Sequence, residues 1–316
     1  MGSNLLLDSI IQKIVAGRSD WTLEELQYHK NNPQEIEVAL ARERLRVPIH
    51  CSCGGIMIVP CSWNILMLQL ARKHLKKERF LSASEAVALA IYHNVDIDGY
   101  ICIITDDTVS IEIGLYNLGN GVFEAISTRW LSTKEQDRLP KVCDTMLRDL
   151  NLTGKIAQII FARTTPDHIT MHNLERVFQR SVLQVGNLTE LCNMGAFIYQ
   201  GILQGEVRNV LLMQIIPQSI GISDSDGAML TIIQKEAVLP VKITKTVYVF
   251  GSELSILQGN NAVASDNAVI FTLHFQDSGE TQRRQVSLTI AISVNYSCRI
   301  EAEDVNTGEK IVLPPV

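Results

Sequence analysis

Few side chains in this sequence combine the types and spacing that catalysis or metal binding requires. Asp106 and Asp107 stand side by side between two apolar runs, where their carboxylates could bind a metal ion. An acidic hairpin tip is the simpler interpretation of the same pair. His168 and His172 are four residues apart, as two ligands on one helix face would be, but no third ligand accompanies them. We therefore expect no metal at either place.

The cysteines point to the same conclusion. Cys51, Cys53 and Cys61 lack a fourth ligand at the spacing of a zinc finger, so buried strand thiols are the expected interpretation. The chain has 7 Cys, an odd number that lie mostly inside apolar runs, which is typical of small buried side chains in a reducing compartment. We predict neither a structural metal nor a disulfide framework.

Composition excludes several functional classes. The chain has 316 residues, is 46% hydrophobic and carries a net charge of -6, so a basic surface for nucleic acid is not expected. No apolar run reaches the length of a membrane span, and the first residues lack the basic flank of a signal peptide. We expect a cytosolic protein of two domains that binds neither membrane nor nucleic acid directly.

Periodicity predicts helices and buried strands over the first two thirds of the chain. The expected elements are helices within 1–50, a strand at 56–59, helices at 64–77 and 84–93, two strands joined by a polar tip within 100–116, a hairpin turn at 118–124, a buried strand of the parallel type at 155–161, a helix capped by Asp167 or Thr170 that ends at Phe178, and a helix at 190–203.

Beyond Pro217 the apolar period changes to two, which predicts strands. The segments are 228–233, 243–250, 268–275, 286–292 and 298–304, separated by turn residues. Together they predict a β-sandwich.

Between the two patterns lies an apolar segment at Val210, Leu211, Leu212 and Met213. It is too short for a membrane span and too apolar for a solvated tether, so it must dock on another surface. A buried strand entering the second domain is one interpretation. Whether the segment docks inside the chain or on a partner is open.

Several motifs around this segment resemble those of the heat shock protein 70 family. The resemblance rests on the linker with Pro217 to Gly221, the strand and turn Val59 to Asn64, the helix Ser84 to His93, the helix Glu190 to Leu203, and the end of the sandwich from Val294 to Glu309. It implies an α/β actin-like (ribonuclease H-like) nucleotide-binding domain remnant followed by an all-β sandwich. The implied division is 1–206 for a truncated ATPase-type domain, 207–216 for the interdomain linker and 217–316 for a peptide-binding-type sandwich.

The resemblance also suggests site residues. Glu85 matches the family's catalytic-ring glutamate, although Ala86 replaces the adjacent proline. The degenerate nucleotide site falls on Thr105, Asp107, Ser110 and Thr164, where the family's phosphate-binding and adenosine-binding glycines are missing. We therefore expect no catalytic residue and no bound cofactor, with ATP and magnesium as the alternative.

In the sandwich, the resemblance places peptide binding at Ser225, Met229 and Leu254. The loop that arches over peptide in the family is acidic here, and the helical lid has no counterpart. The chain is most similar to the atypical ribosome-associated (heat shock 70 kDa protein 14-like) subfamily.

The expected function is a molecular chaperone or co-chaperone that assists protein folding, including folding during translation, with ATPase activity lost. The implied partners are unfolded or nascent polypeptide, a J-domain co-chaperone and the ribosome. Two alternatives remain open: an ATP-binding chaperone with residual ATPase activity, and a non-catalytic adaptor that binds a J-domain partner.

Overall fold

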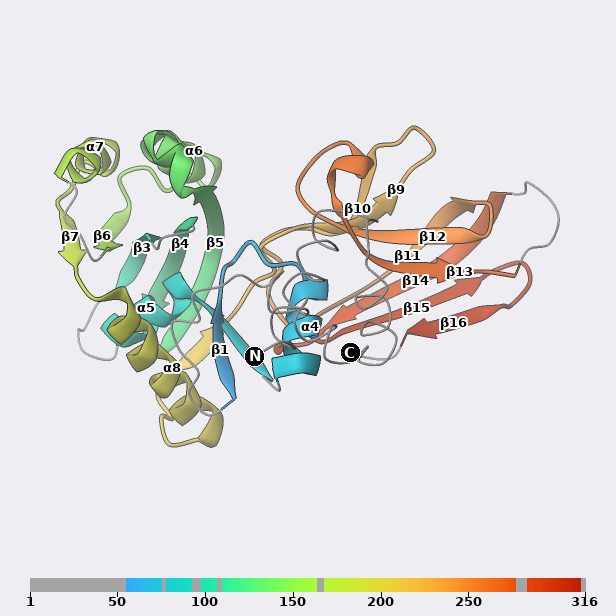
Figure 1. Cartoon of the computed structure of the whole chain (residues 1–316), viewed down its shortest axis with the longest axis horizontal. Helices are drawn as coiled ribbons and strands as arrows, with labels where there is room; N and C mark the ends of the chain where they lie inside the picture. Colours follow the sequence, from blue (N-terminus) through green and yellow to red (C-terminus); the bar gives the residue numbers. More distant parts are fainter. Residues whose placement is uncertain are drawn as a thin grey trace, which may run out of the picture.

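The structure, a computed structural model, describes residues 55–75, 78–92, 98–106, 110–163, 168–276 and 283–313. The helices expected within residues 1–50 lie outside this part of the chain. Two bodies lie side by side (Figure 1). One, the N-terminal unit, is a six-stranded sheet covered by helices, and the other is a pair of four-stranded sheets. The protein is therefore a mixed α/β structure with several sheets.

The N-terminal unit is built on a sheet with the strand order β7-β6-β3-β4-β5-β8. Its strands are β3 (Gly99–Asp106), β4 (Ser110–Gly119), β5 (Val122–Ser132), β6 (Ile156–Ala162), β7 (Val182–Val185) and β8 (Leu211–Met213). The first three form an antiparallel meander, whereas β6 and β7 continue the sheet in parallel beside β3. The predicted hairpin and the parallel type of the strand at 155–161 are confirmed.

Both faces of this sheet are covered because its central strands are apolar on both sides. Ile101 and Ile103 of β3 face the core beneath α5 (Ala83–Tyr92) and α8 (Leu188–Gln204). The alternate residues of β3 face a second core, since successive side chains of a strand point to opposite faces. That core is closed by α6 (Leu139–Asp149), which follows the short helix η1 (Thr133–Arg138), and by α7 (His168–Phe178).

Local sequence explains where several of these elements begin and end. The β4–β5 hairpin turns at Asn120 and Gly121, whose φ angles of 51° and 78° are those of a two-residue turn that matches the twist of the strands. Helix α8 begins after Asn187, whose side chain accepts a hydrogen bond from the Glu190 N–H, and ends at Gly205 with φ 75°.

A small parallel unit lies between the two bodies. It consists of β1 (Ile56–Val59), α4 (Ile65–Leu75) and β2 (Arg79–Ser82), with β1 paired to β2. All four residues of β1 are buried. Ile65 at the start of α4 belongs to the core of the sandwich, so this unit packs against the second body as well as the first.

The second body is the expected β-sandwich. One sheet has the order β10-β9-β12-β13 and the other the order β11-β14-β15-β16. Their strands are β9 (Ile220–Ser223), β10 (Met229–Ile233), β11 (Val241–Phe250), β12 (Glu253–Gln258), β13 (Ala268–His274), β14 (Arg283–Ile292), β15 (Cys298–Asp304) and β16 (Lys310–Leu313), with the short helix η2 (Ala264–Asp266) before β13. Side chains from both sheets share one core, which accounts for the alternating pattern in the sequence.

The sequence patterns do not predict five short strands, namely β2, β7, β9, β12 and β16. One alternative for the cap of α7 is also wrong, because Thr170 lies inside that helix. The other alternative, Asp167, lies outside the described residues. Within the described residues, no helix is both long and apolar enough to cross a bilayer.

Helix α8 crosses α5 at Gly195. A Cβ atom added there would lie 1.9 Å from the backbone oxygen of Ala86 in α5. Two helix backbones therefore touch at this point, and only a hydrogen atom fits between them.

We expect Gly195→Ala to lower the free energy of unfolding by roughly 2 kcal/mol, because the two backbones must separate to admit the methyl group. Urea unfolding followed by circular dichroism measures the effect. Gly186→Ala is the matched control, since no atom lies within 4 Å of the added Cβ at that position. Equal stability of the two variants would contradict close packing of α5 on α8.

Candidate functional site

The polar centre of the junction between the two bodies is Glu85, the third residue of α5. Its side chain accepts a hydrogen bond from the Ser82 N–H at 2.8 Å, and the Ser82 hydroxyl accepts one from the Glu85 N–H at 3.2 Å. This reciprocal pair is a capping box, which fixes the start of the helix. The Ser82-x-x-Glu85 spacing is a signal that the sequence analysis missed.

A second buried carboxylate, Glu112 of β4, lies beside the first. It accepts hydrogen bonds from the Cys61 N–H at 3.1 Å, from the Ser84 N–H at 3.0 Å and from the Ser84 hydroxyl. These donors come from the turn after β1 and from α5, so Glu112 ties both segments to the sheet. The Ser84 hydroxyl also shares a hydrogen bond with the Tyr116 hydroxyl at 2.6 Å.

The two carboxylates differ in their surroundings. Burial raises the pKa of Glu85 from its usual 4.5 to about 7, and the charge of Glu112 adds to the rise. The hydrogen bonds from Ser82 and Gln214 oppose the rise only in part. Glu85 therefore gains or loses its proton near neutral pH.

The apolar segment ahead of Pro217 docks beside this pair of carboxylates. Leu211 to Met213 form β8, which adds a parallel strand to β5, and the Leu211 N–H donates to the Gly121 oxygen at 2.7 Å. Val210 and Leu212 pack against the core under α5. The segment thus docks inside the chain, as an edge strand of the first sheet.

Gln214 follows this strand and is only 5% exposed. Its side-chain amide nitrogen donates to both Glu85 carboxylate oxygens and to the Phe80 oxygen, each at 3.3 Å. Its amide oxygen accepts a hydrogen bond from the Tyr199 hydroxyl at 3.4 Å. A buried amide is costly unless it is hydrogen-bonded, so these contacts specify the register of the docked segment.

The same segment continues into the sandwich. Ile215 bridges to Val238, and its backbone oxygen accepts a hydrogen bond from the Tyr296 hydroxyl at 3.2 Å. Arg129 of β5 forms an ion pair with Glu236 at 2.6 Å across the junction. Burial opposes ionisation of Glu236, but hydrogen bonds from Ser127 and Arg129 outweigh it and leave the pKa of Glu236 below its usual value.

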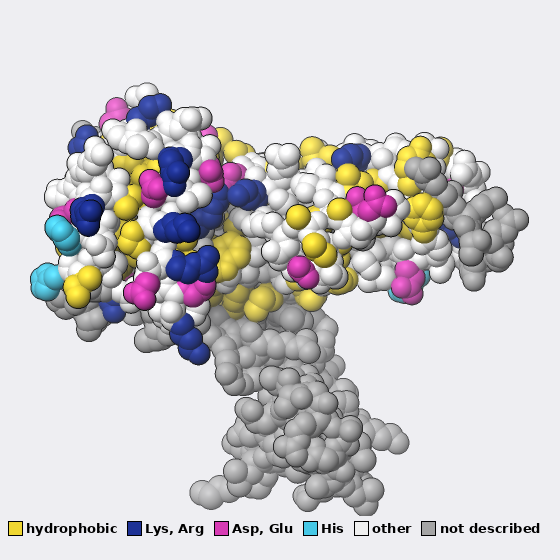
Figure 2. Space-filling view, turned by 90° about the horizontal axis from the view of Figure 1, so that it is seen from above, with side chains coloured by type: hydrophobic (Ala, Val, Ile, Leu, Met, Phe, Trp, Pro, Cys, Tyr) yellow, Lys and Arg dark blue, Asp and Glu magenta, His cyan; other side chains and the backbone are white. Residues whose placement is uncertain are grey.

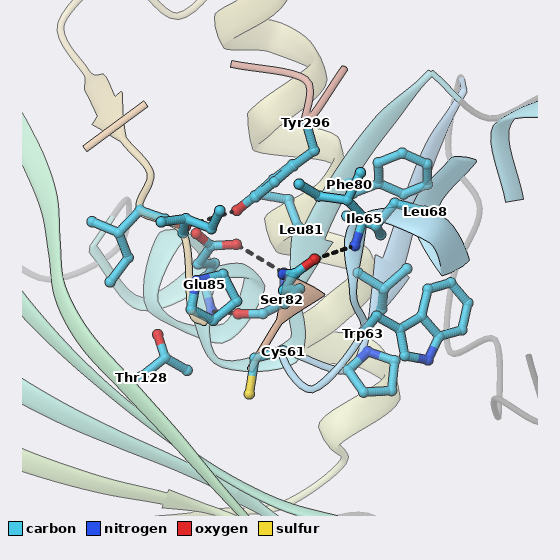
Figure 3. A pocket seen from close by; sticks show the side chains of 16 residues that line it. Cys61, Trp63, Ile65, Leu68, Phe80, Leu81, Ser82, Glu85, Thr128 and Tyr296 are labelled. Atoms are coloured by element: carbon cyan, nitrogen blue, oxygen red, sulfur yellow. Dashed lines mark hydrogen bonds between the residues drawn. The ribbon is translucent and has the colours of Figure 1, made fainter. Parts of the chain in front are cut away.

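A small cavity lies where these parts meet (Figure 3). Its volume is ≈ 30 Å³, room for little more than a water molecule. The lining is mainly apolar and includes Trp63, Phe80, Ile216 and Tyr296, with the Glu85 carboxyl group in its wall. This geometry explains the raised pKa of Glu85 and leaves no room for a nucleotide or peptide.

The nucleotide-site residues of the sequence analysis lie elsewhere, at the ends of β3 and β4. Thr105 is buried at the end of β3 and lies beside Ala162 of β6, whereas Ser110 begins β4. Asp107 and Thr164 lie outside the described residues. The carboxyl ends of parallel strands are where ligands bind in α/β sheets, so these residues occupy a suitable edge.

An ion pair spans this edge. The Arg163 guanidinium lies 2.9 Å from the Asp106 carboxylate, with exposed side-chain fractions of 24% and 6%. Neither position has the freedom of glycine, which lets backbone N–H groups approach a phosphate. A magnesium ion at Asp106 would have to compete with the guanidinium group of Arg163.

The three expected peptide-binding residues lie on one sheet of the sandwich and differ in exposure. Ser225 is exposed in the turn between β9 and β10, and Met229 is half-buried at the start of β10. Leu254 of β12 is 4% exposed and packs in the core of the sandwich. The turn between β11 and β12 is short, so no long loop arches over the sheet from that side.

Of the candidate metal ligands, Cys61, Asp106, His168 and His172 lie within the described residues, whereas Cys51, Cys53 and Asp107 lie outside them. Cys61 is buried, and burial raises the pKa of its thiol well above the usual value. His168 and His172 both lie on α7. Within the described part of the chain, no group of three or more His, Cys, Asp or Glu side chains could hold a metal ion.

The structure belongs to a class of protein in which a mixed α/β unit is joined by a docked strand to a β-sandwich. Comparison with known proteins identifies the class. The family model described as "Hsp70 protein" matches residues 137–313, which is more than half of the chain. The chain belongs to the Hsp70 family.

A curated relative agrees with this assignment. "Chaperone protein DnaK" of Prochlorococcus marinus (strain MIT 9515) is 28% identical over 203 residues, a match that covers 61% of this chain and 31% of the relative. The matched region therefore spans about a third of the length of that relative.

The raised pKa of Glu85 predicts a pH dependence of stability. Glu85 holds its proton up to about pH 7 in the folded state but only to about 4.5 when exposed. Stability contributed by the protonated carboxyl is present below pH 4.5 and is lost as the pH rises to about 7. The shift corresponds to roughly 3 kcal/mol.

We expect Glu85→Gln, which stays neutral, to flatten the dependence of the free energy of unfolding on pH between about pH 4.5 and 7. Urea unfolding at several pH values measures both slopes. Glu190→Gln on the surface of α8 is the control and should keep the wild-type slope. If Glu85→Gln also kept it, Glu85 would not be the buried titrating group.

Proposed function

We propose that this chain is a chaperone-type protein that binds unfolded or nascent polypeptide through its β-sandwich and does not hydrolyse ATP. The observation that carries the proposal is the docked segment, which forms a strand of the first sheet and then runs into the sandwich. Membership of the Hsp70 family supports it.

The proposal includes the finer assignments. The N-terminal unit is the remnant of an actin-like (ribonuclease H-like) nucleotide-binding domain, with the division 1–206, 207–216 and 217–316. Its assigned partners are a J-domain co-chaperone and the ribosome, its compartment is the cytosol, and its subfamily is the atypical ribosome-associated one. Pairing of β8 with β5 supports a scaffold role for the N-terminal unit, because this contact needs no nucleotide.

The loss of ATPase activity is argued from the edge formed by β3 and β6. Phosphoryl transfer requires a phosphate cradle and bound magnesium at one place. Here Arg163 neutralises Asp106, and a side chain stands at each of the described positions on that edge. The proposed site residues Thr105, Asp107, Ser110 and Thr164 would at most form a weak nucleotide site.

The peptide site is assigned to the sheet that contains β9, β10 and β12. Ser225 and Met229 lie at its accessible end, and Leu254 provides buried apolar support beneath. A peptide bound there would contact the half-buried Met229 side chain, which is flexible and suited to varied apolar partners.

Fluorescence anisotropy with a labelled apolar peptide tests the peptide site in the full chain. We expect Met229→Glu to weaken binding by roughly tenfold, because a carboxylate would be desolvated against the apolar peptide. Val312→Glu on β16 of the opposite sheet is the matched control and should bind as the wild type does. Absence of peptide binding by the wild type would favour the non-catalytic adaptor.

Calorimetric titration with magnesium-ATP tests the nucleotide edge. We expect no saturable binding at micromolar concentrations and no rise in melting temperature with millimolar nucleotide, since a ligand that binds the folded state must stabilise it. Saturable binding with ATP turnover would replace the proposal with the ATP-hydrolysing chaperone.

A further inference from the structure

A second and larger pocket lies at the junction and is lined mainly by amide side chains. It lies between the turn before α4, strand β5 and the loops that flank β12 and β13 of the sandwich, and its volume is ≈ 330 Å³. We call it the amide pocket. The lining side chains that matter here are Asn64, Trp130, Gln258, Asn260, Asn261 and Asp266.

Three of these amides are held in one orientation by the backbone. In each, the side-chain oxygen accepts a hydrogen bond from a main-chain N–H, which leaves the NH₂ group as a free donor. The anchoring bonds run from the Met67 N–H to Asn64 at 2.9 Å, from the Ile65 N–H to Gln258 at 2.8 Å, and from the Ser219 N–H to Asn260 at 3.0 Å.

The NH₂ groups of these three amides make no hydrogen bond to another residue in the described part of the chain. Gln258 is 3% exposed and lines both the amide pocket and the small cavity beside Glu85. Donor groups that open onto a pocket without a protein partner can bind a ligand or ordered water. The pocket therefore presents fixed donors that the fold itself does not use.

Acceptors accompany the donors. Asn261 donates its NH₂ group to the Asp266 backbone oxygen at 2.7 Å, which leaves its side-chain oxygen available. The Asp266 carboxylate is exposed and makes no hydrogen bond to any residue that the structure describes. A group that donates and accepts at once, such as a hydroxyl, matches this combination.

Charge excludes a phosphate-like ligand. No Lys, Arg or His lines the pocket, and its one charged side chain is a carboxylate. Elsewhere on the N-terminal unit, Lys and Arg side chains are plentiful and mixed with acidic ones (Figure 2). Trp130 adds a half-buried aromatic surface, on which the C–H faces of a ring can pack.

We propose that the amide pocket binds a neutral polyhydroxylated ligand of the size of a mono- or disaccharide. The volume of ≈ 330 Å³ falls at the lower end of the range for small-molecule sites. Trp130 comes from the N-terminal unit, Asn64 from the small parallel unit, and Gln258 and Asn260 from the sandwich. The ligand therefore holds these parts together.

Titration of the full chain with D-glucose and with maltose, followed by isothermal calorimetry and by saturation-transfer NMR, tests the proposal. We expect saturable binding of at least one probe in the millimolar range, together with a change in Trp fluorescence. The double variant Asn64→Asp/Asn260→Asp keeps the anchored oxygens and removes the donors. It should bind at least about tenfold more weakly.

Asn193→Asp on the exposed face of α8 is the matched control and should bind as the wild type does. Urea unfolding of the double variant checks that the fold is intact. The proposal is overturned if neither probe binds saturably, or if the double variant binds as tightly as the wild type. Binding of an apolar peptide at the amide pocket without binding of either free sugar would overturn the proposal too, and would assign the pocket to polypeptide.

Discussion

The structure depends on one buried contact, the amide of Gln214 against the Glu85 carboxylate. Neither group could be buried alone without a large desolvation penalty. Together they fix the apolar segment beside α5, and that register sets both the pairing of β8 with β5 and the entry of the chain into the sandwich. The relative placement of the two bodies therefore follows from a polar contact rather than from apolar area alone.

This contact also explains why Glu85 is both a structural and a titratable residue. Its capping box with Ser82 starts α5, while its position in the wall of the small cavity raises its pKa to about 7. The neighbouring Glu112 accepts hydrogen bonds from the Cys61 and Ser84 N–H groups and anchors the turn after β1. Two carboxylates of the same type thus acquire different tasks from their surroundings.

Much of the fold is predictable because its signals are local. The Asn120-Gly121 turn, the Gly205 helix end and the alternation in β14 and β15 each specify one structure without help from distant residues. The strands that are missed have only four residues, as in β7 and β9, or follow a tight turn, as in β12. Their stability comes from neighbours far along the chain, which periodicity cannot reveal.

The sites are harder to predict than the fold for the same reason. Gln214 is one polar residue in an apolar run, and only its distance to Glu85 gives it a role. The amide pocket joins Asn64 to Asn260, which are nearly two hundred residues apart, and no local pattern links them. The anchored amide oxygens satisfy main-chain N–H groups and so serve the fold, but the donors left free beside an aromatic ring at the junction do not. Their convergence on one cavity is what distinguishes a binding site from ordinary loop capping there.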